Sequence, residues 1–380
     1  MRRWMLIVCL VLLCVMILPV APGLTQEAQV TLIAVNVGKA DCLILHYQGQ
    51  SFMIDTGTVQ SVGRIRACLE AVGLSHFKGI FVTHSDKDHY GGLAPLLEGG
   101  VTYDTLYASP MTSEKAHALS GYEVSWLESG DRIPLADNVY FDVLGPLAED
   151  LNEENNNSLV MAFHSPWGSI LFGGDMLLGE EQALLHKGLI PACEILKVPY
   201  HGGDKATSQA LVDAVRPKVA VISTNTRERE STPSSDVLYK LNRVGAKTLV
   251  TQDAQGAIWM TLPDLAADPV AFTTVPQSIT PLQIQSLDTA NEVLTLSCYT
   301  NEAVSLKGWY LYSDRGGECY FFPDEAVLPA SGSLTLGTRT TDIETDLLWP
   351  EKNVIHNSKD DTLTLYDPWG RAVSSIGNGF

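Results

Sequence analysis

The sequence is poor in basic residues, and its cysteines lack the spacings of metal knuckles. Its 380 residues include 25 Lys and Arg against 44 Asp and Glu, which gives a formal charge of −19. This charge repels polyanions over most of the surface, so any contact with nucleic acid must be local. Hydrophobic residues make up 45% of the chain and charged residues 18%, a balance that excludes intrinsic disorder. At roughly 150 residues per domain, two or three domains are expected.

Five cysteines remain beyond the first 25 residues, an odd number with no CxxC spacing. Neither a zinc knuckle nor a disulfide framework is therefore expected. Cys298 and Cys319 lie in one strand-rich stretch. They could form a bridge in an exported protein or remain two buried free thiols on neighbouring strands.

One long apolar run is present, and it lies at the N-terminus. Arg2 and Arg3 precede an uncharged apolar segment over residues 4–20. This pattern predicts an export signal over residues 1–25, with cleavage favoured over anchoring. The chain is then expected to be secreted or extracytoplasmic, with the option of association with the cell surface. A single apolar segment cannot form a transmembrane channel, so none is expected.

Strand and helix patterns alternate over residues 26–264 and predict a layered α/β domain. Residues 62–72 carry apolar side chains at helical spacing, and a buried strand pattern follows at residues 79–83. Residues 208–215 predict another helix after several strand-to-loop units. This order is typical of a sheet covered by helices.

The composition changes near residue 265, where Pro, Asp, Ala and Thr replace helical periodicity. We expect a linker at residues 265–280 and a separate all-β domain at residues 281–380, where short strands alternate with turns. Truncation near Pro276 is predicted to leave a soluble, metal-binding N-terminal domain, because the linker interrupts both composition and periodicity.

Residues that can bind metal gather in the segment His-Ser-Asp-Lys-Asp-His, directly after an apolar strand and before an apolar helix start. Four possible ligands, His84, Asp86, Asp88 and His89, fall within these six residues. The strand end keeps His84 and Asp86 on one side of the chain, and the turn into a helix brings the other two to the same point. The segment predicts a site for two adjacent cations. The competing interpretation is a polar loop with Asp88 as a helix cap.

Two later residues extend this set. Asp175 follows an apolar strand and two glycines, and His201 ends the strand ILKVPY and precedes two more. Glycines at a strand end let another group approach closely. Either residue alone could be a turn or structural residue. The remaining histidines lack such a placement and are interpreted as surface or core residues: His46, His76, His117, His164, His186 and His356.

Together these segments resemble the metallo-β-lactamase fold superfamily, most closely the hydrolase domain of ComEC/Rec2 competence proteins. The resemblance covers about residues 30–259 and runs through VNVGKADCLIL, MIDTG, THSDKDHYGG, ENNNSLV, FGGD and LKVPYHGG. It implies a four-layered αββα sandwich that holds two divalent metal ions, zinc or manganese, in a cleft at the sheet edges. Asp55 of MIDTG is implied to support the loop. The implied metal ligands are His84, Asp86, Asp88, His89, Asp175 and His201, with Asp88 and Asp175 also in catalytic roles.

The resemblance also implies how the ligands divide between the ions. His84, Asp86 and His201 would hold one ion, Asp88 and His89 would hold the other, and Asp175 would bridge them.

Several positions depart from the superfamily pattern. Asp86 stands where HxHxDH has its second histidine, which shifts metal preference toward harder ions such as manganese. Tyr200 and Thr232 stand where the competence-protein subgroup often has histidines. The third-motif histidine is absent, and Asn157 or Ser158 stands near its place. These departures put full activity in question.

Residues 281–380 resemble the lamin-tail domain, an immunoglobulin-like sandwich, from NEVLTLSCYTNEAVSLKGWYLYS to KDDTLTLYDPWGRAVSS. Trp309 within this stretch is interpreted as a core aromatic rather than a ligand platform. In exported bacterial proteins such a module resembles an accessory domain beside a hydrolase. We expect it to bind a surface partner, although the sequence names no ligand.

The expected function is that of a secreted metal-dependent hydrolase, a phosphodiesterase that uses a metal-bound hydroxide. Its phosphodiester substrate could be nucleic acid, a cell-wall component or a small nucleotide. The acidic chain favours short or small diesters, since Lys87 and Lys205 are the cations near the metal segments. Two alternatives remain open: an extracellular DNA nuclease, and an inactive binding protein of the same fold at the cell surface.

Overall fold

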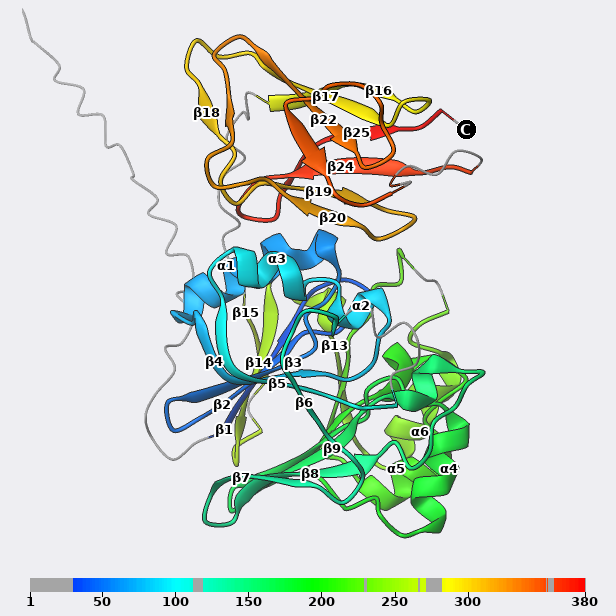
Figure 1. The fold of residues 1–380 in the computed structure, drawn as a ribbon. Helices are drawn as coiled ribbons and strands as arrows, with labels where there is room; N and C mark the ends of the chain where they lie inside the picture. The colour runs from blue at the N-terminus through cyan, green and yellow to red at the C-terminus, as the bar shows by residue number, and fades with distance from the viewer. Residues whose placement is uncertain are drawn as a thin grey trace, which may run out of the picture.

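The computed structural model contains a large α/β domain and a smaller β domain (Figure 1). It describes residues 30–111, 119–228, 231–265, 267–270, 282–352, 354 and 359–379. The expected export signal, most of the expected linker, His117 and His356 lie outside these residues. In the described part of the chain, no helix has the length and apolar character needed to span a bilayer.

Two facing sheets form the centre of the α/β domain. The first sheet has the order β15 (Ala267–Val270), β14 (Ala257–Leu262), β1 (Val30–Val35), β2 (Leu43–Tyr47), β3 (Gln50–Ile54), β4 (His76–Val82), β5 (Thr102–Ala108) and β6 (Val124–Trp126). The second has the order β13 (Lys247–Val250), β12 (Val219–Ile222), β11 (Ile195–Lys197), β10 (Gly168–Phe172), β9 (Val160–Ser165), β8 (Val139–Gly145) and β7 (Arg132–Ala136).

Helices cover the outer face of each sheet (Figure 1). The first sheet packs against α1 (Val62–Val72) and α3 (Leu93–Glu98), beside the short helix α2 (Lys87–Tyr90). The second packs against α4 (Leu178–His186), α5 (Gln209–Val215) and α6 (Ser235–Arg243). The expected αββα sandwich is thereby confirmed, and α1 and α5 form where the sequence predicts helices.

Burial on both faces explains the continuous apolar strands of the sequence. In β1, Leu32 and Ala34 pack between the two sheets, whereas Ile33 and Val35 pack in the layer of α1 and α3. A strand that is buried on both faces carries an apolar run rather than a strict alternation.

Strand direction brings the loops of the site to one edge. In the first sheet β3, β4 and β5 are parallel neighbours, and in the second sheet β10, β11, β12 and β13 are parallel neighbours. Segments that follow parallel strands leave the sheet at the same edge. The loops after β3 and β4 therefore share one edge of the first sheet, and those after β10 and β11 share one edge of the second. A contact of 3.3 Å between His89 and Asp175 shows that the two edges meet.

The C-terminal domain is a sandwich of two four-stranded sheets with an additional two-stranded pair. One sheet has the order β16 (Leu282–Asp288), β17 (Val293–Cys298), β22 (Ser333–Thr338) and β23 (Leu347–Trp349), and the other has the order β20 (Cys319–Phe321), β19 (Tyr310–Ser313), β24 (Thr362–Tyr366) and β25 (Ala372–Gly377). The pair is β18 (Val304–Ser305) with β21 (Val327–Leu328). Trp309 is buried in the core, as expected of a packing aromatic.

Two expectations need adjustment. Residues 267–270, assigned to the linker from composition, form β15 at the edge of the first sheet. An edge strand tolerates Pro269, because one of its sides needs no amide donor. Cys298 and Cys319 are both free thiols and lie on strands of different sheets, so they are not neighbours that bridge. Cys298 is buried and Cys319 partly buried.

Candidate metal centre

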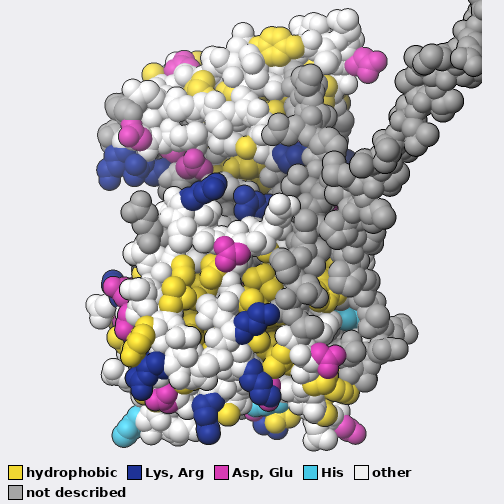
Figure 2. Space-filling view, turned by 180° about the vertical axis from the view of Figure 1, so that it is seen from behind, with side chains coloured by type: hydrophobic (Ala, Val, Ile, Leu, Met, Phe, Trp, Pro, Cys, Tyr) yellow, Lys and Arg dark blue, Asp and Glu magenta, His cyan; other side chains and the backbone are white. Residues whose placement is uncertain are grey.

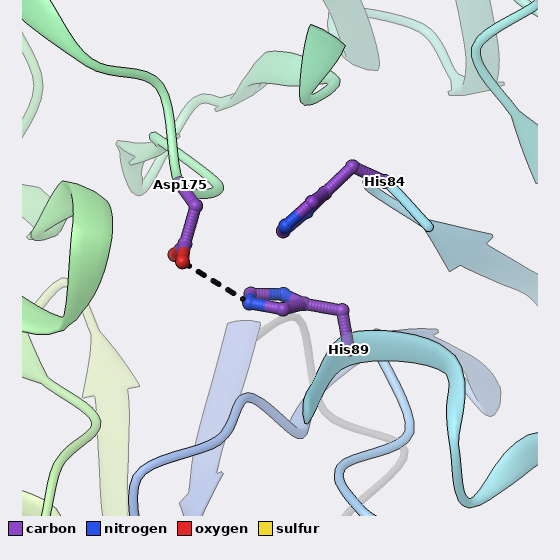
Figure 3. A group of neighbouring side chains, drawn as sticks. All are labelled: His84, His89 and Asp175. Atoms are coloured by element: carbon purple, nitrogen blue, oxygen red, sulfur yellow. Dashed lines mark ion pairs between the residues drawn. The ribbon is translucent and has the colours of Figure 1, made fainter. Parts of the chain in front are cut away.

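The predicted ligands converge at the edge where the two sheets meet. His84 follows β4, His89 lies on α2, and Asp175 follows β10. Figure 3 shows Asp175 pointing from the second sheet toward the two imidazoles. His201 follows β11 and joins the same group, because β10 and β11 run parallel.

Short distances join these side chains. His89 Nε2 lies 3.3 Å from Asp175 Oδ2, and His201 Nε2 lies 3.1 Å from the same oxygen. Asp88 Oδ2 lies 3.4 Å from His201 Nε2. The ring centroids of His84 and His89 are 4.1 Å apart. Five of the six predicted ligands thus form one continuous cluster.

The cluster contains two compact groups of three possible ligands. One consists of His84, His89 and Asp175, and the other of Asp88, His89 and His201, with ligand atoms within 4.8 Å of one another in each group. This grouping differs from the one that the resemblance implies, since His84 and His201 fall in different groups. Asp175 contacts the histidines of both groups, which suits a shared ligand.

Asp86 lies at the edge of the cluster. Its Oδ2 is 3.7 Å from His84 Nε2, and its side chain is 33% exposed. Among the described residues, none of the compact groups includes it. Asp86 is the extended residue that precedes α2, so its position follows from the entry of the chain into this helix.

The hydrogen bonds of the three histidines fix which ring nitrogen carries the proton. His201 Nδ1 donates to the carbonyl oxygen of Ser223 at 2.8 Å, because a carbonyl can only accept. His89 Nδ1 donates to Asp55 Oδ2 at 2.7 Å. The hydroxyl of Thr83 donates its proton to Asp55 Oδ2 at 2.8 Å. The same hydroxyl oxygen therefore accepts the hydrogen bond from His84 Nδ1, which lies 3.2 Å away.

In the neutral rings, each Nε2 is then left with its lone pair. All three Nε2 atoms are buried without a hydrogen-bond partner, as is Oδ1 of Asp175. Buried polar atoms without partners are costly, and several that converge on one point suit a bound cation. The donor set of imidazole nitrogens and carboxylate oxygens therefore fits divalent metal ions.

Charge in the cluster is balanced between the carboxylates and imidazoles. Burial acts to raise the pKa of Asp175, but His201 and His89 beside it outweigh burial and hold that pKa well below its usual range. Burial acts to lower the pKa values of His89 and His201, but the surrounding carboxylates together raise both: Asp175 and Asp55 at His89, and Asp175, Asp88 and Asp41 at His201. His89 and His201 thus favour the charged form of Asp175, and Asp175 favours the charged form of these two imidazoles, when no metal is bound.

Asp55 connects the loops behind the ligands. Besides His89, it accepts hydrogen bonds from the amide and hydroxyl of Thr83, each at 2.8 Å. Its backbone is left-handed, with φ of 59°, a conformation that Asp adopts more readily than most residues. Asp55 thus holds the loop and orients His89, as the resemblance implies.

Sequence reasoning missed a fully buried ion pair behind the site, formed by Asp41 and Lys197. Lys197 Nζ also donates to the carbonyl oxygen of Gly174 at 3.3 Å and lies 4.0 Å from Asp175 Oδ1. Asp41 Oδ2 lies 3.8 Å from His89 Nδ1. The available signal was Lys197 inside the apolar run ILKVP and Asp41 directly before the apolar run CLIL, since Asp and Lys are rarely fully buried unless paired.

Lys39 is a second residue that the sequence analysis did not single out. Its Nζ donates to Asp88 Oδ2 at 2.6 Å, and both side chains are mostly buried. Its backbone amide donates to Glu228 Oε2 at 2.9 Å. Lys39 therefore holds one carboxylate of the cluster at the rim of the site.

The departures from the superfamily pattern have structural roles. Ser158, near the place of the missing third-motif histidine, accepts a hydrogen bond from the amide of Asp175 at 3.1 Å. Thr232 is buried, and its Oγ1 lies 2.6 Å from that of Thr224. Asn157 binds the backbone of Asp150 in the adjoining loop.

Comparison with known proteins places this geometry in a family. Residues 35–226 match the metallo-beta-lactamase superfamily, and residues 276–379 match the lamin tail domain. The chain is 27% identical over 263 residues to ComE operon protein 3 of Bacillus subtilis, which covers 62% of this chain and 33% of that protein. It is 25% identical over 216 residues to Recombination protein 2 of Haemophilus influenzae, which covers 55% of this chain and 26% of that protein. The chain thus spans a third or less of the length of these relatives.

Among solved structures, Igni18, a metallo hydrolase from Ignicoccus hospitalis, aligns with a TM-score of 0.44 at 14% identity over 61% of this chain and 98% of that one. The superfamily match spans half of the chain and includes every residue of the cluster. The chain belongs to the metallo-β-lactamase superfamily.

Proposed function

We propose that this chain is an exported, metal-dependent phosphodiesterase that acts on short or small phosphodiesters. The observation that carries the proposal is the convergence of three buried Nε2 atoms and Asp175 at one point, with every Nδ1 held by an acceptor. A hydrolase fold that presents such a donor set supports metal-dependent hydrolysis.

Zinc or manganese ions would be held by His84, His89 and Asp175 and by Asp88, His89 and His201. Bound there, they would activate water and neutralise the oxygens of a phosphate. The mixture of carboxylates with imidazoles lies between the preferences of zinc and manganese.

The chain's own residues prepare the site for this chemistry. Asp55 and Ser223 fix the orientation of His89 and His201 through Nδ1, which keeps each Nε2 directed into the site. Lys39 holds Asp88 as a carboxylate at the rim. The buried pair of Asp41 and Lys197 places one more charge of each sign behind the ligands without changing the net charge.

The formal charge of −19, together with the one face drawn in Figure 2, supports a small substrate. On the face opposite that of Figure 1, Lys and Arg side chains lie in separate patches among acidic and uncharged ones, and the described residues show no continuous basic track there (Figure 2). Tight binding of a long duplex would need many phosphate contacts by cations. Two metal ions can neutralise a single phosphate locally, so a small diester needs no such track.

Export is supported by the sequence pattern of residues 1–25. The lamin-tail-like domain would then act beside the hydrolase domain and could bind a surface partner. Export and binding of a surface partner concern where the protein acts, and the proposed chemistry of the metal site does not depend on them.

An extracellular nuclease is the second candidate. It is favoured by the similarity to a relative that is named for recombination. An inactive binding protein of the same fold is the third, favoured by Tyr200, Thr232 and the absent third-motif histidine.

The test uses the full chain without its first 25 residues, freed of metal by a chelator and then loaded with Mn²⁺ or Zn²⁺. Turnover is compared on bis(4-nitrophenyl) phosphate, a single-stranded oligonucleotide and a long duplex, at low and moderate salt. The proposal expects metal-dependent turnover of the small diester at least as efficient as that of the duplex. A preference for the duplex that collapses as salt rises would favour the nuclease, and no turnover with either metal would favour the inactive binding protein.

A further inference from the structure

We propose that the lamin-tail-like domain braces the metal-ligand helix α2, so that its docking on the α/β domain sets the order of this helix and the affinity of the metal site. The affinity part rests on the metal centre of the proposed function, whereas the part that concerns the order of α2 does not. Figure 1 shows this domain seated on the side of α1, α2 and α3.

Helix α2 has one face toward the site and another toward the lamin-tail-like domain. Asp88 and His89 point into the ligand cluster. Lys87 stands between Asp86 and Asp88 in the sequence. Its Nζ donates to the carbonyl oxygen of Arg315, in the lamin-tail-like domain, at 3.2 Å. Tyr90 lines a cavity between the domains together with Tyr312. Movement of the C-terminal domain would therefore act directly on this helix.

A second connection runs through the loop between β3 and α1. Val59 in this loop is 4% exposed and packs against three tyrosines of the lamin-tail-like domain, Tyr310, Tyr312 and Tyr366. Gln60 Nε2 donates to Asp314 Oδ1 at 3.2 Å. The loop thus carries both an apolar and a polar contact with the C-terminal domain.

The same loop holds the backbone of α2. The amide of Thr56 donates to the carbonyl oxygen of His89 at 2.6 Å, and the amide of Gly92 donates to the carbonyl oxygen of Gly57 at 3.0 Å. Only Thr58 separates Gly57 from Val59. A short stretch of chain therefore joins the domain contact to a metal ligand.

The three tyrosines form an aromatic face that is buried by the docking, which we call the tyrosine face. In β19, Leu311 points into the core of the sandwich, whereas Tyr310 and Tyr312 point away from that core toward Val59. The tyrosine side chains are 1%, 6% and 3% exposed for Tyr310, Tyr312 and Tyr366. An apolar face of this kind is a liability when exposed to water, so its burial favours permanent docking.

Close packing between backbone atoms of the two domains also favours permanent docking. A Cβ atom added at Gly63 of α1 would lie 3.1 Å from the carbonyl oxygen of Gly370 and 3.2 Å from that of Trp369. The domains meet with no room for a side chain at this position. The proposal therefore departs from the expectation that truncation near Pro276 leaves an intact metal-binding domain.

The test introduces a wedge into the full chain at Gly63. In Gly63→Leu the new side chain must push the domains apart, while leucine favours the helix more than glycine does. Ala71→Leu is the matched control, because Ala71 lies on the same helix and is exposed. Tyr312→Ala is a second variant that weakens the tyrosine face from the other domain and leaves α1 unchanged.

Two readouts separate the two parts of the proposal. Hydrogen exchange of residues 86–92 is measured in the metal-free proteins, and Mn²⁺ or Zn²⁺ affinity is measured by competition with a chelator. In Gly63→Leu and Tyr312→Ala, the backbone amides of residues 86–92 are expected to exchange faster than in the wild type. Both variants are also expected to bind metal about tenfold more weakly, a loss typical of residues that support metal ligands. Ala71→Leu is expected to resemble the wild type in both measurements. If Gly63→Leu fails to fold, Tyr312→Ala decides the outcome.

Unchanged exchange of residues 86–92 in the interface variants would overturn the proposal. Faster exchange with unchanged metal affinity would overturn its second half. If the wild-type chain binds no metal, the proposed function fails, but the exchange experiment still decides whether docking orders α2.

Discussion

Asp55 Oδ2 lies 2.7 Å from His89 Nδ1, and this hydrogen bond joins the end of β3 to the metal-ligand helix. The carboxylate of Asp55 also binds Thr83, so one buried charge orients two segments of the site. Hydrogen bonds to an ionised acceptor are among the stronger ones in proteins. Asp55 is therefore the residue behind the ligands whose charge should matter most for metal binding.

Asp55→Asn should weaken metal binding by roughly 10- to 100-fold without unfolding the domain. Asparagine also tolerates the left-handed backbone of position 55, so the substitution removes charge and leaves the conformation accessible. Competition with a chelator measures the affinity. Asp104→Asn, which alters an exposed carboxylate paired with Lys78, serves as control, and equal affinities in both variants would contradict the role of Asp55.

Lys197→Met should lower the free energy of unfolding of the metal-free protein by about 3–5 kcal/mol, because Asp41 would be left buried without its partner charge. Denaturant unfolding measures this loss. Lys78→Met removes an exposed lysine from a similar pair and should cost much less. A loss of the same small size in both variants would show that burial of the Asp41 and Lys197 pair has no energetic consequence.

The stability of the metal-free protein should fall as the pH rises from about 6.5. Burial acts to lower the pKa values of His89 and His201, but Asp175 and the other carboxylates beside them together raise both. Histidines with raised pKa values stabilise the folded state below the pKa of the unfolded chain, and this contribution is lost as the pH passes the folded pKa. Protons also compete with metal for Nε2, so the increase in Tm on adding Zn²⁺ should grow with pH.

Thermal unfolding at about pH 6 and about pH 8, with chelator and with metal, measures both effects within the range where histidine titrates. A metal-free Tm that rises steadily with pH would contradict the assignment of stabilising charge to these histidines.

Asp88→Asn should release more metal than Asp86→Asn. Asp88 belongs to a compact group with His89 and His201, whereas Asp86 is one-third exposed and lies at the edge of the cluster. We expect at least a tenfold larger loss of affinity for Asp88→Asn, because a lost ligand costs more than a lost edge contact. Metal analysis of the two purified variants measures the difference, and a larger loss in Asp86→Asn would reverse the assignment.

The sequence predicts most of the cluster because its residues stand where apolar strands end. His84, Asp175 and His201 each follow a strand, and parallel neighbours deliver such residues to one edge of a sheet. The helical spacing of residues 62–72 likewise predicts α1 correctly, since one face of that helix packs on the sheet.

Long-range pairing is what the sequence could not predict. Asp41 lies in the loop between β1 and β2, whereas Lys197 lies on β11 of the second sheet, and no local pattern shows that the two residues face each other. The grouping of His84 apart from His201 likewise depends on how the two sheets pack. Composition assigns residues 267–270 to the linker, because it cannot distinguish an edge strand from a loop. The docking of the tyrosine face depends on two surfaces that are distant in the chain.

The most direct measurement of the central claim is a titration of metal-free full chain with Mn²⁺ and with Zn²⁺, in which bound metal and turnover of bis(4-nitrophenyl) phosphate are followed together. The account predicts two ions bound per chain, turnover that appears as they bind, and loss of both in Asp175→Asn. Full turnover without bound metal, or no binding of either metal by the wild-type chain, would contradict it.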